Sequence, residues 1–173
     1  MTPAVNKQQI KYLSSHPPTY LRVATPLGNI GVVIAKDEVI ALQLQPSDFP
    51  DNNPPSSLAV LVKKQLAAYF HSPMTPFDLP LRFIGSEFQC RVWQALRDIP
   101  CRHTLTYGEL AQRLQTSARA IGNACRTNPI PLIVPCHRVV ARGHVGGYAG
   151  HQAGKTWQIK PWLLAHEQAS VGR

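Results

Sequence analysis

The sequence predicts an α/β protein of the α+β kind, with a small antiparallel sheet and helix followed by a mainly helical half. Short strand-like runs, separated by turn residues at 26–29 and 36–38, predict three short strands early in the chain. Two capping boxes begin short apolar helices in the second half. A stretch with three prolines then presents Cys136, His137 and Arg138 in succession. We therefore predict a scaffold domain over residues 1–84 and a second domain, carrying the chemistry, over residues 85–173.

The first half contains the predicted sheet and one helix. Residues 1–19 have little periodicity, and we expect a loose lead-in there. Strands are predicted at 20–25, 30–35 and 39–44, followed by a proline-rich loop at 46–55. Ser56 or Ser57 can cap a helix that runs to Phe70. An extended connector, with a short strand near 79–83, leads to the domain boundary near Gly85.

The second half begins with three predicted helices. Ser86 and Gln89 form a capping box for a helix that stops before Pro100, and we interpret Cys90 and Trp93 on it as packing residues. Thr106 and Glu109 form a second box, and a third short helix covers 117–126 after a tight turn. Two short helices across a tight turn are typical of a helix-turn-helix.

Small residues on the third of these helices suggest what it contacts. Ala118, Ala120, Gly122 and Ala124 would let it lie close to a DNA groove, or equally close to another part of the protein. Residues 85–173 hold eleven Lys and Arg against four Asp and Glu, whereas residues 1–84 hold seven against five. This concentration of positive charge favours nucleic acid as the partner.

The proline-rich stretch over 128–139 predicts a stiff extended strand, because its prolines exclude a helix. Most free cysteines are small, buried hydrophobic residues. From this stretch alone, Cys136 is equally well explained as a packing residue of the core and as a nucleophile. Residues 141–154 are rich in glycine and predict a mobile or closely approached loop. Pro161 is predicted as the first residue of a last helix.

Composition excludes several other classes of protein. The 173 residues are 44% hydrophobic, and no apolar run approaches the roughly 18 residues that a membrane-spanning helix requires. The N-terminus lacks a secretory signal pattern, so we expect a cytoplasmic protein with no membrane partner. The four cysteines show no Cys-x-x-Cys spacing and no paired histidines, so we expect neither a metal site nor a disulfide framework.

Together these segments resemble the O6-alkylguanine-DNA alkyltransferase family, the suicidal DNA-repair methyltransferases. The resemblance covers residues 85–168 strongly and 20–80 loosely, and its motifs are 88–100, 106–111, 118–122, 128–129, 135–139, 147–150 and 162–167. It implies a ribonuclease H-like scaffold domain, a monomer, no cofactor, and double-stranded DNA with alkylated bases as partner. O6-alkylguanine is the implied lesion, with O4-alkylthymine as a second candidate.

The resemblance also implies a role for each site residue. Cys136 would accept the alkyl group, His137 would deprotonate it through a water, and Glu167 would orient His137. Asn128 would brace the turn before the active-site strand, and Tyr107 would help rotate the nucleotide and protonate the departing base. The implied DNA contacts are Arg119, which would fill the gap in the base stack, and Tyr107, Ala118, Arg126 and Arg138. The implied pocket residues are Val139, Gly147, Tyr148, Ala149 and Lys160.

The chemistry of a thiol and a paired base fits these roles. A free thiol has a pKa of about 8.5, so a neighbouring base must raise the thiolate fraction near neutral pH. The O6 atom of guanine lies inside the duplex, so the nucleotide must flip out to meet a buried thiol. A thioether has no good leaving group, and we expect no second thiol beside Cys136. Each molecule would then react once, without S-adenosylmethionine.

Two other functions remain open from the sequence. A non-catalytic helix-turn-helix module that binds alkylated DNA would use the same helices. A cysteine hydrolase would pair Cys136 with a histidine, but adjacent residues of an extended strand point to opposite faces, which disfavours direct pairing with His137. The chain also departs from the family, because Arg102 stands where glycine is usual and the segment 150–162 is longer than in the shortest members.

Overall fold

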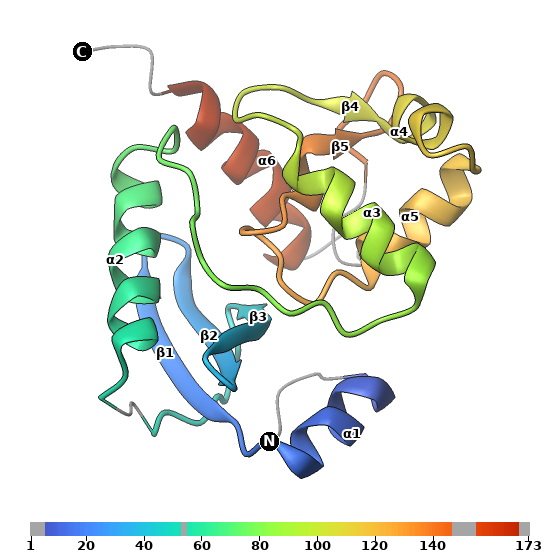
Figure 1. Cartoon of the computed structure of the whole chain (residues 1–173). Helices are drawn as coiled ribbons and strands as arrows, with labels where there is room; N and C mark the ends of the chain where they lie inside the picture. Colours follow the sequence, from blue (N-terminus) through green and yellow to red (C-terminus); the bar gives the residue numbers. More distant parts are fainter. Residues whose placement is uncertain (1–5, 53–54, 147–154, 170–173) are drawn as a thin grey trace. The chain divides into compact units, whose positions relative to one another are not determined.

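The computed structural model describes residues 6–52, 55–146 and 155–169, and the chain divides into two compact units, Met1–Gly85 and Ser86–Arg173 (Figure 1). The first unit contains α1 (Lys7–Ser15), β1 (Thr19–Thr25), β2 (Gly28–Ala35), β3 (Glu38–Leu44) and α2 (Ser57–His71). The second contains α3 (Glu87–Arg97), β4 (Leu105–Thr106), α4 (Tyr107–Arg113), α5 (Ala118–Arg126), the 3-10 helix η1 (Cys136–Arg138), β5 (Val139–Val140) and α6 (Lys155–Ala169). The predicted α+β class is confirmed.

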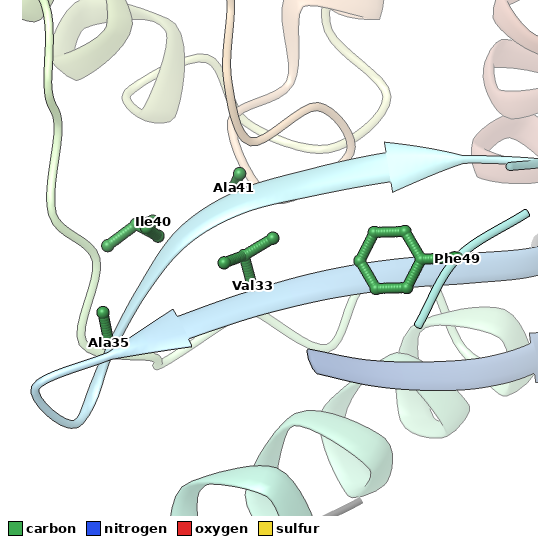
Figure 2. Packing of buried hydrophobic residues seen from close by; sticks show 5 residues of the cluster. All are labelled: Val33, Ala35, Ile40, Ala41 and Phe49. Atoms are coloured by element: carbon green, nitrogen blue, oxygen red, sulfur yellow. The ribbon is translucent and has the colours of Figure 1, made fainter. Parts of the chain in front are cut away.

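The sheet of the first unit has the order β1-β2-β3, with both pairs antiparallel. Its core includes Val33, Ala35, Ile40, Ala41 and Phe49, which lie together in Figure 2. Gly31 on β2 makes room for this core, because a Cβ there would lie 2.4 Å from the Phe49 ring. Helix α2 lies against β1, and its N-cap is Ser56 as predicted.

Helix α1 lies where the sequence predicted a loose lead-in, so that prediction was wrong. Asn6 caps the helix in a full capping box, in which the Gln9 amide donates to Asn6 Oδ1 and the Asn6 amide donates to Gln9 Oε1, both at 2.8 Å. The buried Gln9 side chain also donates to the Ile40 carbonyl at 2.9 Å. A tertiary hydrogen bond therefore fixes a helix whose apolar periodicity is weak.

The strand predicted near 79–83 is also not formed, apart from a single parallel bridge between Val39 and Leu81. The Val39 amide donates to the Pro80 carbonyl at 2.8 Å, and the Arg82 amide donates to the Val39 carbonyl at 3.0 Å. Pro80 has no N–H with which to continue the ladder.

The three predicted helices of the second unit are confirmed with their caps. Ser86–Gln89 and Thr106–Glu109 form the expected capping boxes, and Ser117 caps α5. Trp93 on α3 is fully buried, and its indole N–H donates to the Ala124 carbonyl on α5 at 2.9 Å. Trp93 is therefore a packing residue, as predicted, and it ties α3 to the second helix of the pair.

The stretch leading to Cys136 is not an extended strand, and this prediction was wrong. The Val134 amide donates to the Ile130 carbonyl at 2.9 Å, which closes a turn in which Leu132 has φ of +74°. Cys136 then begins η1, because the Arg138 amide donates back to the Pro135 carbonyl at 3.0 Å. Only β5 is extended, and it pairs in parallel with β4.

Helix α6 begins at Lys155 rather than at Pro161, so the predicted start of the last helix was also wrong. Pro161 lies inside the helix, where it removes one backbone hydrogen bond. The additional turns place Lys160 on the same helix as Glu167. None of the helices in the described ranges combines the length and apolar character needed to cross a bilayer.

Candidate active site

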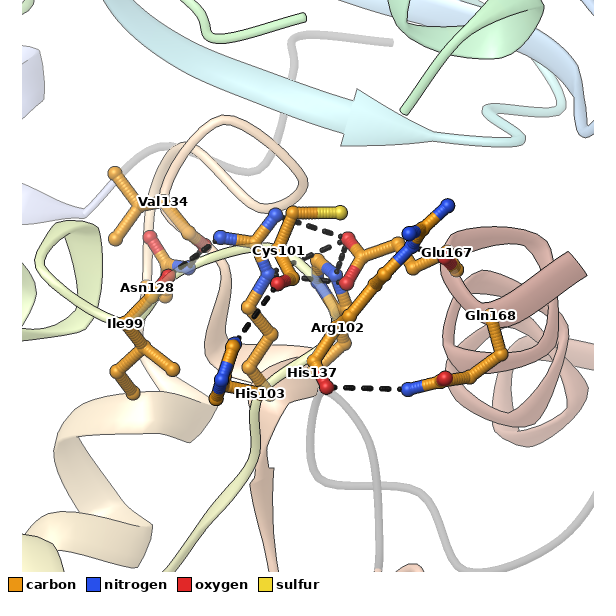
Figure 3. A network of polar contacts seen from close by, with 10 residues as sticks. Ile99, Cys101, Arg102, His103, Asn128, Val134, His137, Glu167 and Gln168 are labelled. Carbon is orange, nitrogen blue, oxygen red and sulfur yellow. Dashed lines mark hydrogen bonds and ion pairs between the residues drawn. The ribbon is translucent and has the colours of Figure 1, made fainter. Parts of the chain in front are cut away.

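Cys136 is buried at the start of η1, with 6% of its surface exposed. Asn128 shapes the turn that leads to it. The Ile130 amide donates to Asn128 Oδ1 at 3.0 Å. Asn128 Nδ2 donates to the Val134 carbonyl at 2.8 Å, as Figure 3 shows. One side chain thus joins both ends of the turn and fixes the backbone just before the thiol.

Glu167 of α6 lies between His137 and Arg138. Its Oε1 atom is 2.8 Å from His137 Nε2, and both residues are buried. Arg138 donates through Nη2 to Oε1 at 3.0 Å and through Nε to Oε2 at 3.1 Å. Arg138 Nη1 also donates to the Ile99 carbonyl at 2.6 Å. A permanently charged guanidinium therefore neutralises the carboxylate that holds the histidine.

These contacts set the charge of the pair. Burial alone would raise the pKa of Glu167, but hydrogen bonds and charge from His137 and Arg138 outweigh it and hold that pKa well below its usual range. Burial lowers the pKa of His137 more than the hydrogen bond and charge of Glu167 raise it, with Arg138 and Lys160 lowering it further. Near neutral pH the carboxylate is ionised and the imidazole is neutral.

The neutral imidazole has only one tautomer that suits this geometry. A carboxylate can only accept, so Nε2 of His137 must carry the proton that is shared with Glu167. Nδ1 then holds a lone pair, and it is buried without a hydrogen-bond partner in the described part of the chain. A buried nitrogen with an unused lone pair is suited to accept a proton, directly or through a water.

Tyr107, Val139 and Lys160 come together on the strand pair. Parallel pairing of Leu105 with Val139 places β5 beside the start of α4. Lys160 is 1% exposed, and its Nζ donates to the Val139 carbonyl at 2.6 Å. The same Nζ lies 3.5 Å from the Tyr107 hydroxyl and 5.5 Å from the ring centroid.

Burial shifts both of these groups towards their neutral forms. It raises the pKa of Tyr107, with charge on Cys125 and Cys136 acting in the same direction, so the phenol keeps its proton near neutral pH. Burial also lowers the pKa of Lys160, which negative charge on Cys136 would raise again. The ammonium group therefore suits a site in which negative charge develops.

Cys125 is a member of this cluster that the sequence analysis missed. Burial raises the pKa of its thiol, and negative charge on Cys136 raises it further while Lys160 lowers it. Cys125 therefore lies close enough to Cys136 for their charges to interact, although the expectation that no second thiol regenerates Cys136 is not contradicted. None of the four cysteines, all of which lie in the described ranges, forms a disulfide, and burial keeps the thiol of Cys125 protonated near neutral pH.

The outer face of α5 carries three of the predicted DNA contacts. Ala118, Arg119 and Arg126 are exposed, whereas Ile121 and Ala124 face the interior. A Cβ added to Gly122 would meet no protein atom within 4 Å. Packing against protein explains the small side chain of Ala124, but it does not explain the glycine at 122.

Two sets of predicted residues stand apart from this arrangement. The structure commits Arg138 to Glu167 and Ile99, with 12% of its side chain exposed, rather than presenting it to DNA. Gly147, Tyr148 and Ala149 lie outside the described residues. Within 6–52, 55–146 and 155–169, no group of three or more His, Cys, Asp or Glu side chains could hold a metal ion.

Known proteins share both the sequence and the fold of this chain. The family model for the DNA-binding domain of 6-O-methylguanine DNA methyltransferase matches residues 87–169. A methylated-DNA–protein-cysteine methyltransferase of Methanosarcina mazei is 52% identical over 113 residues, which cover 64% of this chain and 68% of that protein. Its counterpart in Mycolicibacterium paratuberculosis is 40% identical over 139 residues, covering 76% and 84%. The chain belongs to the methylated-DNA–protein-cysteine methyltransferase family.

A solved structure of this methyltransferase family has the same fold. Mycobacterium tuberculosis OGT in complex with DNA is 35% identical and aligns with a TM-score of 0.72, over 87% of this chain and 93% of that chain. The segment that matches the family model contains Cys136, His137 and Glu167, and also the whole of α5. The resemblance inferred from the sequence motifs is confirmed.

Proposed function

We propose that this chain repairs double-stranded DNA by moving the alkyl group of O6-alkylguanine to the sulfur of its own Cys136. The observation that carries this proposal is the buried, unpartnered Nδ1 of His137, next in sequence to a buried thiol and fixed by Glu167. Family membership supplies the reaction class, since the named relatives are methylated-DNA–protein-cysteine methyltransferases.

The reaction uses the proton positions that the site favours. His137 Nδ1 takes the proton of Cys136 through a water, and the sulfur attacks the alkyl carbon. The bond between that carbon and O6 breaks, and its electron pair stays with the guanine. Tyr107, kept protonated by its raised pKa, donates a proton to the departing base. Lys160, 3.5 Å from the Tyr107 hydroxyl, then stabilises the phenolate.

DNA binding is assigned to the outer face of α5. Arg126 contacts a phosphate, Ala118 and Gly122 allow close approach, and Arg119 fills the gap left by the flipped nucleotide. Such contacts carry little base information, so we expect weak sequence specificity and a steep loss of affinity with salt. Val139 and the segment 147–149 are proposed as the walls of the base pocket.

One turnover and no cofactor follow from the chemistry. The alkyl group comes from the damaged DNA, and the thioether product has no good leaving group. Cys125 cannot regenerate Cys136, because a protonated thiol is a poor nucleophile and a thioether is not cleaved by thiols. The proposal includes a monomer in the reducing cytoplasm, with residues 1–84 as a ribonuclease H-like scaffold.

The test is the mass of the peptide that contains Cys136 after incubation with duplex DNA bearing O6-methylguanine. We expect one added methyl group in the wild type, none in Cys136→Ala, and none with an undamaged duplex. A parallel duplex with O4-methylthymine tests the second lesion, and a benzyl lesion tests the size of the pocket. An unmodified peptide despite tight DNA binding would instead support the non-catalytic binding module, and turnover of an acyl substrate would support a hydrolase.

A further inference from the structure

The segment between α3 and β4 contains an arginine in a conformation that favours glycine. Arg102 has φ of +68°, in the left-handed region that costs free energy for a residue with a Cβ. Such conformations persist where the surroundings over-determine them, and they cluster at functional sites. The contacts of Arg102 show what holds it there.

Arg102 is tied in both directions to the end of α6. Its Nε donates to the Glu167 carbonyl at 3.0 Å, and Gln168 Nε2 donates to the Arg102 carbonyl at 3.1 Å. Figure 3 shows Arg102 and Gln168 beside Glu167 in this network. The last four carbonyls of a helix lack donors within the helix, and a guanidinium there satisfies one of them and complements the helix dipole. Arg102 is therefore a C-terminal cap of α6, supplied by a distant loop.

The residue that receives this cap is the one that orients the base. The Glu167 carboxylate binds His137 and Arg138, and Arg138 also donates to the Ile99 carbonyl. The segment 99–102 thus holds Glu167 twice, by its backbone through Arg102 and by its side chain through Arg138.

We propose that Arg102 is a positioning residue for alkyl transfer, which by capping α6 at Glu167 keeps the carboxylate on His137 Nε2. If α6 frays at Glu167, the imidazole loses its fixed acceptor and its proton can move to Nδ1. Nδ1, the nitrogen needed as a base, then carries a proton for part of the time. This inference rests on the proposed function, because its consequence is a slower transfer to Cys136.

A phosphate contact is the competing role for an arginine in this basic half. The two roles differ in what they change. A lost phosphate contact lowers DNA affinity and its salt dependence, whereas a lost cap changes the histidine and the chemical step at saturating DNA.

The experiment compares Arg102→Ala, Arg102→Gly and Arg102→Lys with the wild type and with Arg97→Ala. The last variant removes the same charge from an exposed site on α3. Single-turnover methyl transfer is measured at saturating DNA bearing O6-methylguanine, and the His137 tautomer is read from ring 15N chemical shifts in the free protein. Arg102→Gly relieves the left-handed strain but removes the donor, so it separates strain from capping.

We expect transfer to be about tenfold slower in Arg102→Ala and Arg102→Gly, below the roughly 100-fold that a 1 Å misplacement can cost. Signal from the Nδ1–H tautomer should grow in both variants. Arg102→Lys should recover most of the rate, and Arg97→Ala should behave as wild type.

The inference would be overturned if Arg102→Ala and Arg102→Gly kept the wild-type transfer rate and the wild-type His137 tautomer. A loss confined to DNA affinity would overturn it too. If the wild type transfers no methyl group, the proposed function fails, and the tautomer comparison alone then decides whether Arg102 positions Glu167. A variant that does not fold is recognised from its 15N spectrum, and Arg102→Gly, which relieves backbone strain, then supplies the comparison.

Discussion

Gly122 offers a substitution that separates folding from DNA binding. A glycine inside a helix costs about 0.5–1 kcal/mol relative to alanine. Since a Cβ at Gly122 meets nothing within 4 Å, Gly122→Ala should stabilise the protein by about that amount. For a chain of this length the melting temperature should rise by about 1–4 °C. Gly122→Leu should melt at or slightly above the wild-type temperature, because leucine is also a strong helix former.

The same leucine should obstruct DNA. It would hold α5 away from the groove and separate Arg126 from its phosphate and Arg119 from the base stack. We expect at least a tenfold loss of affinity, about 1.4 kcal/mol. Losing one phosphate contact should also reduce the slope of log affinity against log salt by about one.

Fluorescence anisotropy with a duplex bearing O6-methylguanine measures this effect, in a Cys136→Ala background that prevents reaction. Ala67→Leu is the matched control, since it adds the same side chain to an exposed position of α2. Unchanged affinity and salt slope in Gly122→Leu would refute the placement of DNA on this face of α5. A clear drop in melting temperature would show that the space beside Gly122 is not open.

Three further predictions concern the turn, the helix and the buried pair. Asn128→Ala removes two hydrogen bonds and should lower the free energy of unfolding by about 2 kcal/mol, measured by urea denaturation, whereas Asn123→Ala on the exposed face of α5 should change it by less than about 0.5 kcal/mol. Arg126→Ala should lower the salt slope of DNA binding by about one, and an unchanged slope would argue against a phosphate contact. Because the pKa of His137 is lowered in the folded state, the unfolded chain binds its proton first, and stability should fall as the pH drops below about 6.5. The pKa of Glu167 is also lowered in the folded state, so a further loss of stability should follow below about pH 4.3. Thermal unfolding from pH 8 to about 2 tests both, and His137→Gln should show a smaller loss near pH 6.

Local signals explain why most elements could be predicted from the sequence. Capping boxes at Ser86 and Thr106 each lie within four residues of chain, and turn residues separate the apolar runs that form β1 to β3. The errors have two origins. At α1 the capping box of Asn6 and Gln9 is an equally local signal that the sequence analysis overlooked, and a hydrogen bond from Gln9 to Ile40 adds a distant contact. The turn before Cys136 depends on the Asn128 side chain, a contact that periodicity does not contain.

The sequence named most residues of the candidate site, but it did not predict how they are arranged. Motifs singled out Cys136, His137 and Glu167, and the structure joins His137 to Glu167, but the sequence analysis placed Cys136 on an extended strand and expected Arg138 only as a DNA contact. An arginine beside a histidine gives no sign in the sequence that it binds the carboxylate of a helix some thirty residues further on. Cys125 was missed for the same reason, because a buried helix position shows no proximity to a distant thiol.

Two residues with strained backbone lie in the segments that hold Cys136 and Glu167. Leu132 and Arg102 both have positive φ, one in the turn before Cys136 and one in the segment that holds Glu167. The Asn128 side chain spans the turn that contains Leu132, whereas hydrogen bonds to Glu167 and Gln168 on α6 hold Arg102. Conformations of this kind cost about 1–3 kcal/mol each and persist where such contacts over-determine them. Cys136, the proposed nucleophile, therefore follows one braced turn, and Glu167 on α6 is held by a second braced segment. Loosening either should slow transfer even with Cys136, His137 and Glu167 all present.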